Sequence, residues 1–319
     1  MADGRIKAIW IMATNPAASM PRASRVRAAL AAFPALGPRR LPLYLYAADG
    51  RVGDVTKLRA RMFSPLSGTL EDAAVLFFDI RGFSTASEKM GPVPLLKALN
   101  DHLAIINARV AKHRGTIVNF IGDAVLAIFG CPVLLPDAAA AAVRCYLEAR
   151  EELAAFQQHR EATGEHCFDL GAGINHGSLV SGAIGSKERL SYSVLGDEVN
   201  LAARLESLTR HYPTEMIFSE TCFDQLPDEL KAHALLIDRC TVKGRKQPTG
   251  LYTLTSAPPE EKTAYEAALQ KYLSGDFLAA ESAFNEIPGP LAAYMRRRCG
   301  QLQVEEGKFW PGYYSWEVK

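Results

Sequence analysis

An apolar run of the 319-residue chain ends in a carboxylate, Val75-Leu76-Phe77-Phe78-Asp79, and continues directly into Ile80-Arg81-Gly82-Phe83-Ser84. The length and bulk of this run predict a strand that is buried on both faces. A carboxylate at the end of such a strand is costly unless a partner neutralises it, and a divalent cation is a suitable partner. The loop that follows precedes a predicted helix, so its backbone N–H groups would face an anion that accompanies the cation. Gly82 permits close approach of the backbone to that anion.

A second carboxylate, Asp123, follows Ile121-Gly122 between two apolar segments, Thr116 to Phe120 and Val125 to Phe129. A Gly-Asp pair between apolar strands is typical of a hairpin. Taken singly, each aspartate is more often a cap or a turn residue. Together, Asp79 and Asp123 predict a site for two Mg²⁺ or Mn²⁺ ions about 4 Å apart, bound by carboxylates from adjacent strands.

Asn200 and Arg204 lie four residues apart in a segment with helical periodicity, Val199 to Leu208. This spacing places an amide and a guanidinium on one face of the helix. A guanidinium in such a position can stabilise a phosphoryl group during its transfer. The alternative interpretation is a solvent-exposed face, or an ion pair between Arg204 and Glu206.

The remaining pattern predicts an α+β sandwich with a βαββαβ order of the ferredoxin-like type. A helix is expected from about Ser84, and Gly115 ends the helical stretch after it. The other expected elements are a long helix from Asp137 to Ala162, a strand pair at Phe168 to Asn175 and Leu179 to Ala183, and closing strands at Glu215 to Ser219 and Leu251 to Leu254.

Three segments differ in composition and pattern. Residues 1–70 form an N-terminal segment and linker without a catalytic motif, residues 71–257 carry the motifs, and residues 258–319 form a small helical extension. Two helices, Lys262 to Leu273 and Phe277 to Asn285, resemble a tetratricopeptide pair that is too short for a solenoid. We expect this extension to pack on the catalytic domain or on a partner protein.

Charge, cysteine content and hydropathy exclude several classes of partner. The net charge of +1 does not favour nucleic acid or an acidic membrane surface. The six cysteines are scattered without metal-ligand spacing, which predicts reduced thiols and a cytoplasmic protein. No apolar stretch reaches the roughly 20 residues that a membrane-spanning helix requires.

Three motifs in this order and separation resemble the catalytic domain of class III adenylyl and guanylyl cyclases. They are Val75 to Ser84, Asn119-Phe120-Ile121-Gly122-Asp123, and Leu195-Gly196-Asp197-Glu198-Val199-Asn200-Leu201-Ala202-Ala203-Arg204-Leu205-Glu206. The resemblance spans about residues 71 to 255. It implies the class III cyclase fold and the conversion of a nucleoside triphosphate, with ATP preferred, into a 3′,5′-cyclic monophosphate and pyrophosphate.

The resemblance also implies roles for individual residues. Asp79 and Asp123, with the Ile80 carbonyl, would bind the two metal ions. Asn200 would orient the ribose, and Arg204 would stabilise the α-phosphate. The residues expected to contact the nucleotide are Ile80, Arg81, Gly82, Phe83, Ser84, Asn119, Ser193, Lys243 and, as a weaker candidate, Arg189. In this family the aspartates come from one protomer and the Asn and Arg from the other, so a homodimer is expected.

The residues expected to select the base match neither the adenylyl nor the guanylyl cyclase pattern of the family. Asn119 replaces the Lys of adenylyl cyclases and the Glu of guanylyl cyclases, whereas Ser193 resembles the Thr of bacterial adenylyl cyclases. ATP is the expected substrate, and a guanylate cyclase or a cyclase of relaxed specificity is the alternative. A catalytically silent domain that binds nucleotide or a regulatory partner is an alternative of a different class. The retention of Asp79, Asp123, Asn200 and Arg204 argues against it.

Overall fold

The structure is a computed structural model that describes residues 68–162, 168–185, 190–304 and 309–316. The chain divides into two compact units. Of the described residues, one unit comprises Gly68, Thr69 and those of 180–194, and the other comprises those of 70–179 and 195–316. The expected N-terminal segment, residues 1–70, lies outside the described residues up to position 67.

A mixed sheet runs through the larger unit in the order β2-β3-β1-β4-β6-β8-β7-β9. Its strands are β1 (Thr69–Arg81), β2 (Thr116–Ile121), β3 (Ala124–Phe129), β4 (Asp169–Gly185), β6 (Met216–Ser219), β7 (Ala234–Val242), β8 (Thr249–Leu254) and β9 (Tyr314–Trp316). The first half of the chain follows a βαββαβ order, and its strands lie in the order β2-β3-β1-β4. This arrangement confirms the predicted α+β, ferredoxin-like fold.

Strand β1 is the buried centre of this half. From Ala73 to Ile80 every side chain except the half-buried Phe77 is buried, as the apolar run predicts. β1 pairs antiparallel with β3, and the register places Phe78 opposite Val125. The next residue of β1 is Asp79, so the pairing brings Asp79 beside the turn between β2 and β3 that carries Asp123.

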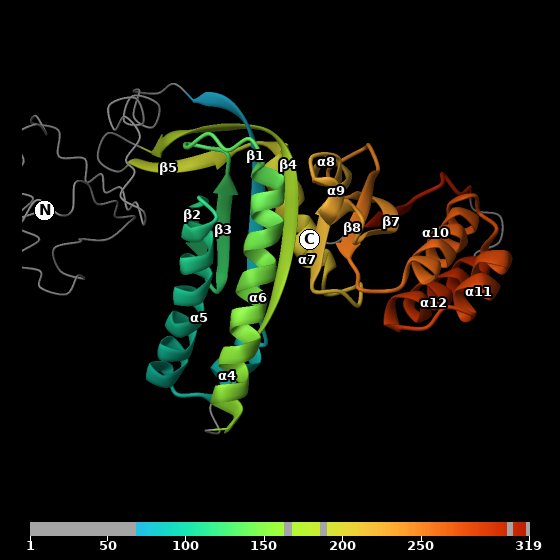
Figure 1. The fold of residues 1–319 in the computed structure, drawn as a ribbon, viewed down its shortest axis with the longest axis horizontal. Helices are drawn as coiled ribbons and strands as arrows, with labels where there is room; N and C mark the ends of the chain where they lie inside the picture. The colour runs from blue at the N-terminus through green and yellow to red at the C-terminus, as the bar shows by residue number, and fades with distance from the viewer. Residues whose placement is uncertain (1–67, 163–167, 186–189, 305–308, 317–319) are drawn as a thin grey trace, which may run out of the picture. The chain divides into compact units, whose positions relative to one another are not determined.

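Two long helices, α5 (Pro92–Lys112) and α6 (Ala138–Ala162), pack side by side along the sheet (Figure 1). The single helix expected from Ser84 is two helices, because α4 (Phe83–Lys89) ends before Gly91 and α5 begins at Pro92. Proline suits the first position of a helix and disfavours helical backbone in the residue before it, which accounts for the break.

The strand pair expected at Phe168 to Asn175 and Leu179 to Ala183 is wrong. Those residues form one continuous strand, β4, and its partner in the smaller unit is β5 (Leu190–Leu195). Gly177 and Ser178 lie between the two expected strands. In the structure Gly177 remains in the strand, and a Cβ at this position would lie 2.9 Å from the Glu198 side chain. The glycine therefore serves close packing against helix α7 (Asp197–Leu208).

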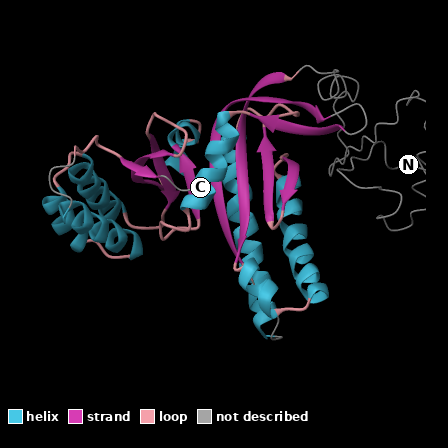
Figure 2. Cartoon of the chain, turned by 180° about the vertical axis from the view of Figure 1, so that it is seen from behind, coloured by secondary structure: helices cyan, strands magenta, loops and turns pink. Residues whose placement is uncertain are grey.

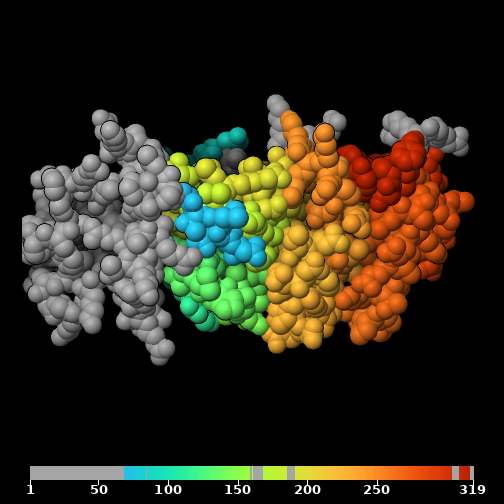
Figure 3. Space-filling view, turned by 90° about the horizontal axis from the view of Figure 1, so that it is seen from above, coloured from blue at the N-terminus to red at the C-terminus, as the bar shows by residue number. Residues whose placement is uncertain are grey.

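The C-terminal extension consists of α10 (Pro259–Leu273), α11 (Phe277–Asn285) and α12 (Pro290–Val304), followed by β9 (Figure 2). The two predicted helices are confirmed, whereas α12 and β9 were not predicted. Buried side chains of α10, α11 and α12 form one core with those of α7, β6, β7 and β8. The extension packs directly on the second half of the sheet, and the two surfaces are continuous in Figure 3.

Short helices α8 (Glu220–Asp224) and α9 (Asp228–Lys231) connect β6 to β7. Each of the five cysteines in the described ranges is buried. Among the helices that the structure describes, none is both long and apolar enough to cross a membrane.

Candidate active site

Asp79 lies at the end of β1 and is only 6% exposed. Its neighbour Ile80 is buried as well, and the chain then turns at Gly82, whose φ of 81° lies in the left-handed region. Glycine adopts this conformation without the steric cost that a side chain would add. The turn ends β1 and starts α4, so Asp79 is held by strand pairing on one side and by a helix on the other.

Asp123 lies in the turn between β2 and β3, which the register closes with the pair Ile121 and Ala124. Gly122 has a φ of 66°, so this position also favours glycine. The predicted hairpin is confirmed. Its rigid pairing holds the half-buried Asp123 next to the end of β1.

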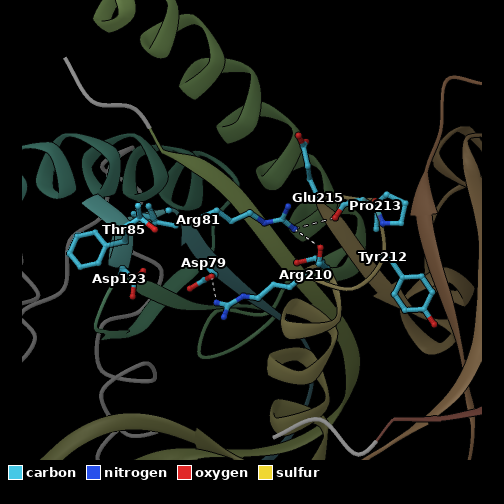
Figure 4. A pocket seen from close by; sticks show the side chains of 13 residues that line it. Asp79, Arg81, Thr85, Asp123, Arg210, Tyr212, Pro213 and Glu215 are labelled. Carbon is cyan, nitrogen blue, oxygen red and sulfur yellow. Dashed lines mark hydrogen bonds and ion pairs between the residues drawn. The ribbon is translucent and has the colours of Figure 1, made fainter. Parts of the chain in front are cut away.

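Asp79 and Asp123 line a single cavity of about 730 Å³ (Figure 4). The other residues that line it come from the β1–α4 turn and from the segment after α7: Ile80, Arg81, Gly82, Phe83, Thr85, Thr209, Arg210, Tyr212, Pro213, Thr214 and Glu215. The structure thus brings the two predicted metal-binding carboxylates together with four of the residues expected to contact nucleotide.

Negative charge accumulates at this cavity. Burial raises the pKa of the Asp123 carboxyl, and the Asp79 carboxylate raises it further. Arg210 Nη2 lies 2.5 Å from Asp79 Oδ2, and Arg210 Nε lies 3.9 Å from Glu206 Oε1. Because the Arg210 side chain is 60% exposed, it can turn away into solvent at little cost.

Arg81 ties the end of β1 to the segment after α7. Its Nη2 donates hydrogen bonds to the carbonyl oxygens of Thr209, at 2.8 Å, and Thr214, at 3.2 Å. Figure 4 shows the side chain extended toward this segment. Arg81 was predicted to contact nucleotide, and the contacts of its Nη2 indicate an anchoring role for this end of the guanidinium.

The Glu206 carboxyl is an unusual group beside the cavity. Its side chain is 11% exposed, and Oε1 has no hydrogen-bond partner within the described ranges. Burial, with the Asp79 carboxylate as the second cause, raises its pKa from the ordinary 4.5 to about 7. The folded protein therefore keeps this proton between pH 4.5 and 7, where the unfolded chain has lost it. Stability is consequently highest below pH 4.5 for this group and falls as the pH rises through 7.

We expect Glu206→Gln to remove this pH dependence. In metal-free buffer the free energy of unfolding of the unmodified protein should fall by up to about 3 kcal/mol more than that of the variant between pH 5 and pH 8. Urea titrations across this range measure the difference, and Glu260→Gln, at an exposed position in α10, is the matched control. Equal slopes for all three proteins would contradict the raised pKa.

A second group of predicted residues lies on and near α7, away from the lining of the cavity. Asn200 is exposed and Arg204 is half-buried on this helix, and the exposed Lys243 follows β7. A Cβ on Gly244 would lie 3.3 Å from Arg204 Nη2, so Arg204 adjoins the Lys243-Gly244 turn. Its Nη1 is buried, and none of the described residues offers it a hydrogen bond. Within the described residues, the guanidinium therefore keeps one hydrogen-bonding position unused.

Arg245 fixes the turn that carries Lys243 to the start of α7. Its Nε lies 2.9 Å from Asp197 Oδ2, and its Nη2 lies 2.8 Å from Glu198 Oε1. Glu198 also accepts a 2.6 Å hydrogen bond from the buried Asn175 side chain. This network was not predicted, because sequence alone does not show that the turn after β7 meets α7.

The remaining predicted residues are separate from the cavity lining. Asn119 is exposed on β2, and Ser193 is half-buried on β5 in the smaller unit. Ser84 lies in α4. Arg189 lies outside the described residues. Sequence reasoning missed Arg210, Tyr212 and Thr214, for which the only signal was a position shortly after a motif-bearing helix.

The residues at the cavity fit a divalent cation. Carboxylate oxygens from Asp79 and Asp123 are the hard donors that Mg²⁺ and Mn²⁺ prefer. Burial is the main cause that raises the pKa of Asp123, and the nearby Asp79 carboxylate adds to it; a bound cation would offset both effects. The described ranges hold no cluster of three or more His, Cys, Asp or Glu ligands. Two carboxylates are nevertheless enough for ions that keep waters and bind substrate phosphates.

Comparisons with known proteins agree with this geometry. Residues 67–256 match the family model described as the adenylate and guanylate cyclase catalytic domain. The chain is 35% identical over 182 residues to adenylate cyclase 1 of Rhizobium meliloti (strain 1021), which covers 57% of this chain and 27% of that protein. It therefore spans about a quarter of the length of this relative.

Two solved structures have a similar fold over about three fifths of this chain. The adenylyl cyclase CyaB from P. aeruginosa is 30% identical with a TM-score of 0.54, and the match covers 61% of this chain and 98% of that chain. The guanylyl cyclase Cya2 is 31% identical with a TM-score of 0.54, over 61% of this chain and 96% of that chain. An adenylyl and a guanylyl cyclase are thus equally similar to this chain.

Proposed function

Since the chain belongs to the family of adenylate and guanylate cyclase catalytic domains, we propose that it converts ATP into 3′,5′-cyclic AMP and pyrophosphate. The observation that carries the proposal is the convergence of Asp79 and Asp123 on one cavity lined by the β1–α4 turn. Two opposed carboxylates beside a cavity of this size suit a metal-bound triphosphate. We propose residues 71–257 as the catalytic domain and residues 258–319 as a helical extension.

Asp79, Asp123 and the Ile80 carbonyl would hold two Mg²⁺ or Mn²⁺ ions. When bound, the ions supply Lewis-acid stabilisation of phosphate charge and ease the ionisation of the ribose 3′-hydroxyl. The 3′-oxygen forms a bond to the α-phosphorus while the bond from the α-phosphorus to the pyrophosphate oxygen breaks, and the hydroxyl proton is released. The role of the protein is to position these groups and to stabilise charge.

Asn200, Arg204 and Lys243 complete the proposed site from a second copy of the chain. In one chain these residues lie outside the lining of the cavity around Asp79, as far as the described ranges extend. Arg204 presents a buried guanidinium nitrogen without a partner among those residues, which suits the α-phosphate. Exposed apolar side chains, including Phe120 and Ile121 on β2, provide a surface that a second protomer would cover. We therefore propose a homodimer with two sites.

Ser193 and Asn119 favour ATP without excluding GTP. Ser193 supplies a hydroxyl to the base, as in the bacterial adenylyl type, and the Asn119 amide can both donate and accept. Guanylate cyclase activity is the alternative within the family. A silent nucleotide-binding or regulatory domain is the alternative of another class, and the orientation of Asp79 and Asp123 toward one cavity opposes it.

A direct assay tests the proposed function. We expect the purified full chain to form cyclic AMP from ATP with Mg²⁺ or Mn²⁺, with a kcat/KM for ATP about tenfold above that for GTP, the discrimination that one hydrogen bond to the base provides. Chromatography of reactions run with each nucleotide and each metal measures both products. A preference for GTP would establish the guanylate alternative, and no product under any condition would favour the silent domain.

A further inference from the structure

A buried ion pair joins the C-terminal extension to the catalytic sheet. Arg298 of α12 is 5% exposed and Asp238 of β7 is fully buried, and Arg298 Nη1 contacts Asp238 Oδ2 directly. The Tyr212 hydroxyl donates a 2.5 Å hydrogen bond to the same carboxylate oxygen. Two charges removed from water are costly and often do not improve stability over an apolar pair. The cost of burying this ion pair therefore suggests that it has a role beyond packing.

Aromatic rings surround the guanidinium. The Arg298 Cζ atom lies 5.0 Å from the ring centre of Tyr212, 4.7 Å from that of Tyr294, 4.4 Å from that of Tyr314 and 5.2 Å from that of Trp316. These rings attract the cation through their faces, and they exclude water from the ion pair. Tyr294 lies on α12 and the last two on β9, so the extension supplies most of the enclosure.

Arg298, Asp238 and the surrounding rings form a C-terminal cluster, and this cluster fixes the orientation of Tyr212. Its hydroxyl donates to Asp238 and accepts from Arg298 Nη1 at 3.1 Å and from Trp316 Nε1 at 3.2 Å. One donated and two accepted hydrogen bonds use the full capacity of a hydroxyl group. The ring is therefore held in a single orientation.

Tyr212 also belongs to the segment 209–215, which lines the cavity around Asp79. In the same segment Arg210 pairs with Asp79, and the carbonyl oxygens of Thr209 and Thr214 accept hydrogen bonds from Arg81. Figure 4 shows the Tyr212 ring directed away from Asp79, on the opposite side of the segment from Arg210. The segment is thus anchored to the catalytic strand on one side and to the C-terminal cluster on the other.

We propose that Arg298 is a positioning residue for the catalytic site, acting through Tyr212 on the segment 209–215 and hence on Asp79 and Arg81. Its effect on turnover rests on the proposed cyclase function, whereas its effect on the segment does not. The C-terminal extension is then part of the catalytic machinery, because it completes the anchorage of a segment that lines the active cavity.

Hydrogen exchange and kinetics on the full chain test this proposal. Tyr212→Phe removes only the hydroxyl, and Arg298→Met removes the guanidinium. Arg297→Met is the matched control, because Arg297 is the exposed neighbour on α12. The amides of residues 209, 210, 211, 212 and 214 are hydrogen-bonded within the segment or to α7, so their exchange reports its anchorage. Circular dichroism confirms that each variant is folded at the assay temperature.

We expect both test variants to accelerate exchange in 209–215 by at least about tenfold, the ratio that corresponds to a lost hydrogen bond to a charged group. We also expect kcat to fall about tenfold, because a small displacement of positioned groups costs that much in rate, while the nucleotide KM changes less than about twofold. If the test variants lost thermal stability but matched Arg297→Met in exchange and in kcat, the proposal would be overturned. Arg298 would then only stabilise the fold.

Because hydrogen exchange does not depend on catalysis, the exchange and kinetic measurements test this inference and the proposed function separately. If the unmodified chain forms no cyclic nucleotide, the proposed function fails, and the exchange of residues 209–215 still decides whether the cluster anchors the segment. If Arg298→Met does not fold, Tyr212→Phe decides it alone, because it keeps the ring and the ion pair.

Discussion

Asp79→Ala is expected to lower cyclic-nucleotide formation by at least about a thousandfold, with both Mg²⁺ and Mn²⁺. Asp79 is the more buried of the two carboxylates at the cavity, and strand pairing with β3 fixes it beside Asp123. Without it the site would keep one of its two carboxylates, and the proposed metal ions would be bound more weakly. The loss of electrostatic stabilisation in a preorganised site commonly reaches this size.

The variant should nevertheless remain folded. Arg210, the main partner of the Asp79 carboxylate, has a side chain that is 60% exposed, so it can turn into water when the carboxylate is removed. Asp72→Ala is the matched control, because Asp72 lies on the same strand with a side chain that is 71% exposed. Initial rates and Mn²⁺ binding by electron paramagnetic resonance are the measurements. If Asp79→Ala kept the initial rate and the Mn²⁺ binding of Asp72→Ala, the assignment of Asp79 as a metal ligand would be wrong.

The fold could be predicted from the sequence where the pattern is local. The run from Val75 to Asp79 is too apolar for any place but the middle of a sheet, and Gly122-Asp123 specifies a two-residue turn. The break at Pro92 was missed because the apolar positions on both sides keep the same helical spacing. The strand pair was wrong because the chain continues through Gly177 as one strand, where the glycine allows close packing against Glu198, a neighbour that is distant in sequence.

The site could be predicted only as far as its motifs extend. Asp79 and Asp123 were identified because strand ends and hairpin turns place side chains in known directions. Arg210 and Tyr212 were not, because their importance arises from long-range contacts with Asp79 and Asp238. Nothing in the sequence distinguishes Arg298 from its neighbours Arg296 and Arg297, yet those two are exposed and Arg298 is only 5% exposed. Such a distinction depends on the rotation of α12 against β7, which the sequence of the helix alone does not determine.

A mixture of two inactive variants should recover activity if the site is shared between protomers. We expect Asp79→Ala and Arg204→Ala to be nearly inactive separately, since each removes one half of both sites in a symmetric dimer. Mixed and re-equilibrated in equal amounts, half of the dimers combine one chain of each kind. Such a dimer contains one intact site and one that lacks both groups, so the recovered rate should be about a quarter of that of the unmodified protein.

The matched control is a mixture of Asp79→Ala with Asp123→Ala. Because both aspartates line the same cavity of one chain, each site in the mixed dimer still lacks one carboxylate, and no activity should return. Recovery in the first mixture but not in the second therefore assigns Arg204 and the aspartates to opposite protomers. The physical basis is the separation seen within one chain. Arg204 has a guanidinium nitrogen without a hydrogen-bond partner among the described residues, and it lies beside Gly244 and not in the lining of the Asp79 cavity. Equal failure of both mixtures, with heterodimers verified by mass spectrometry, would place the whole site within a single chain.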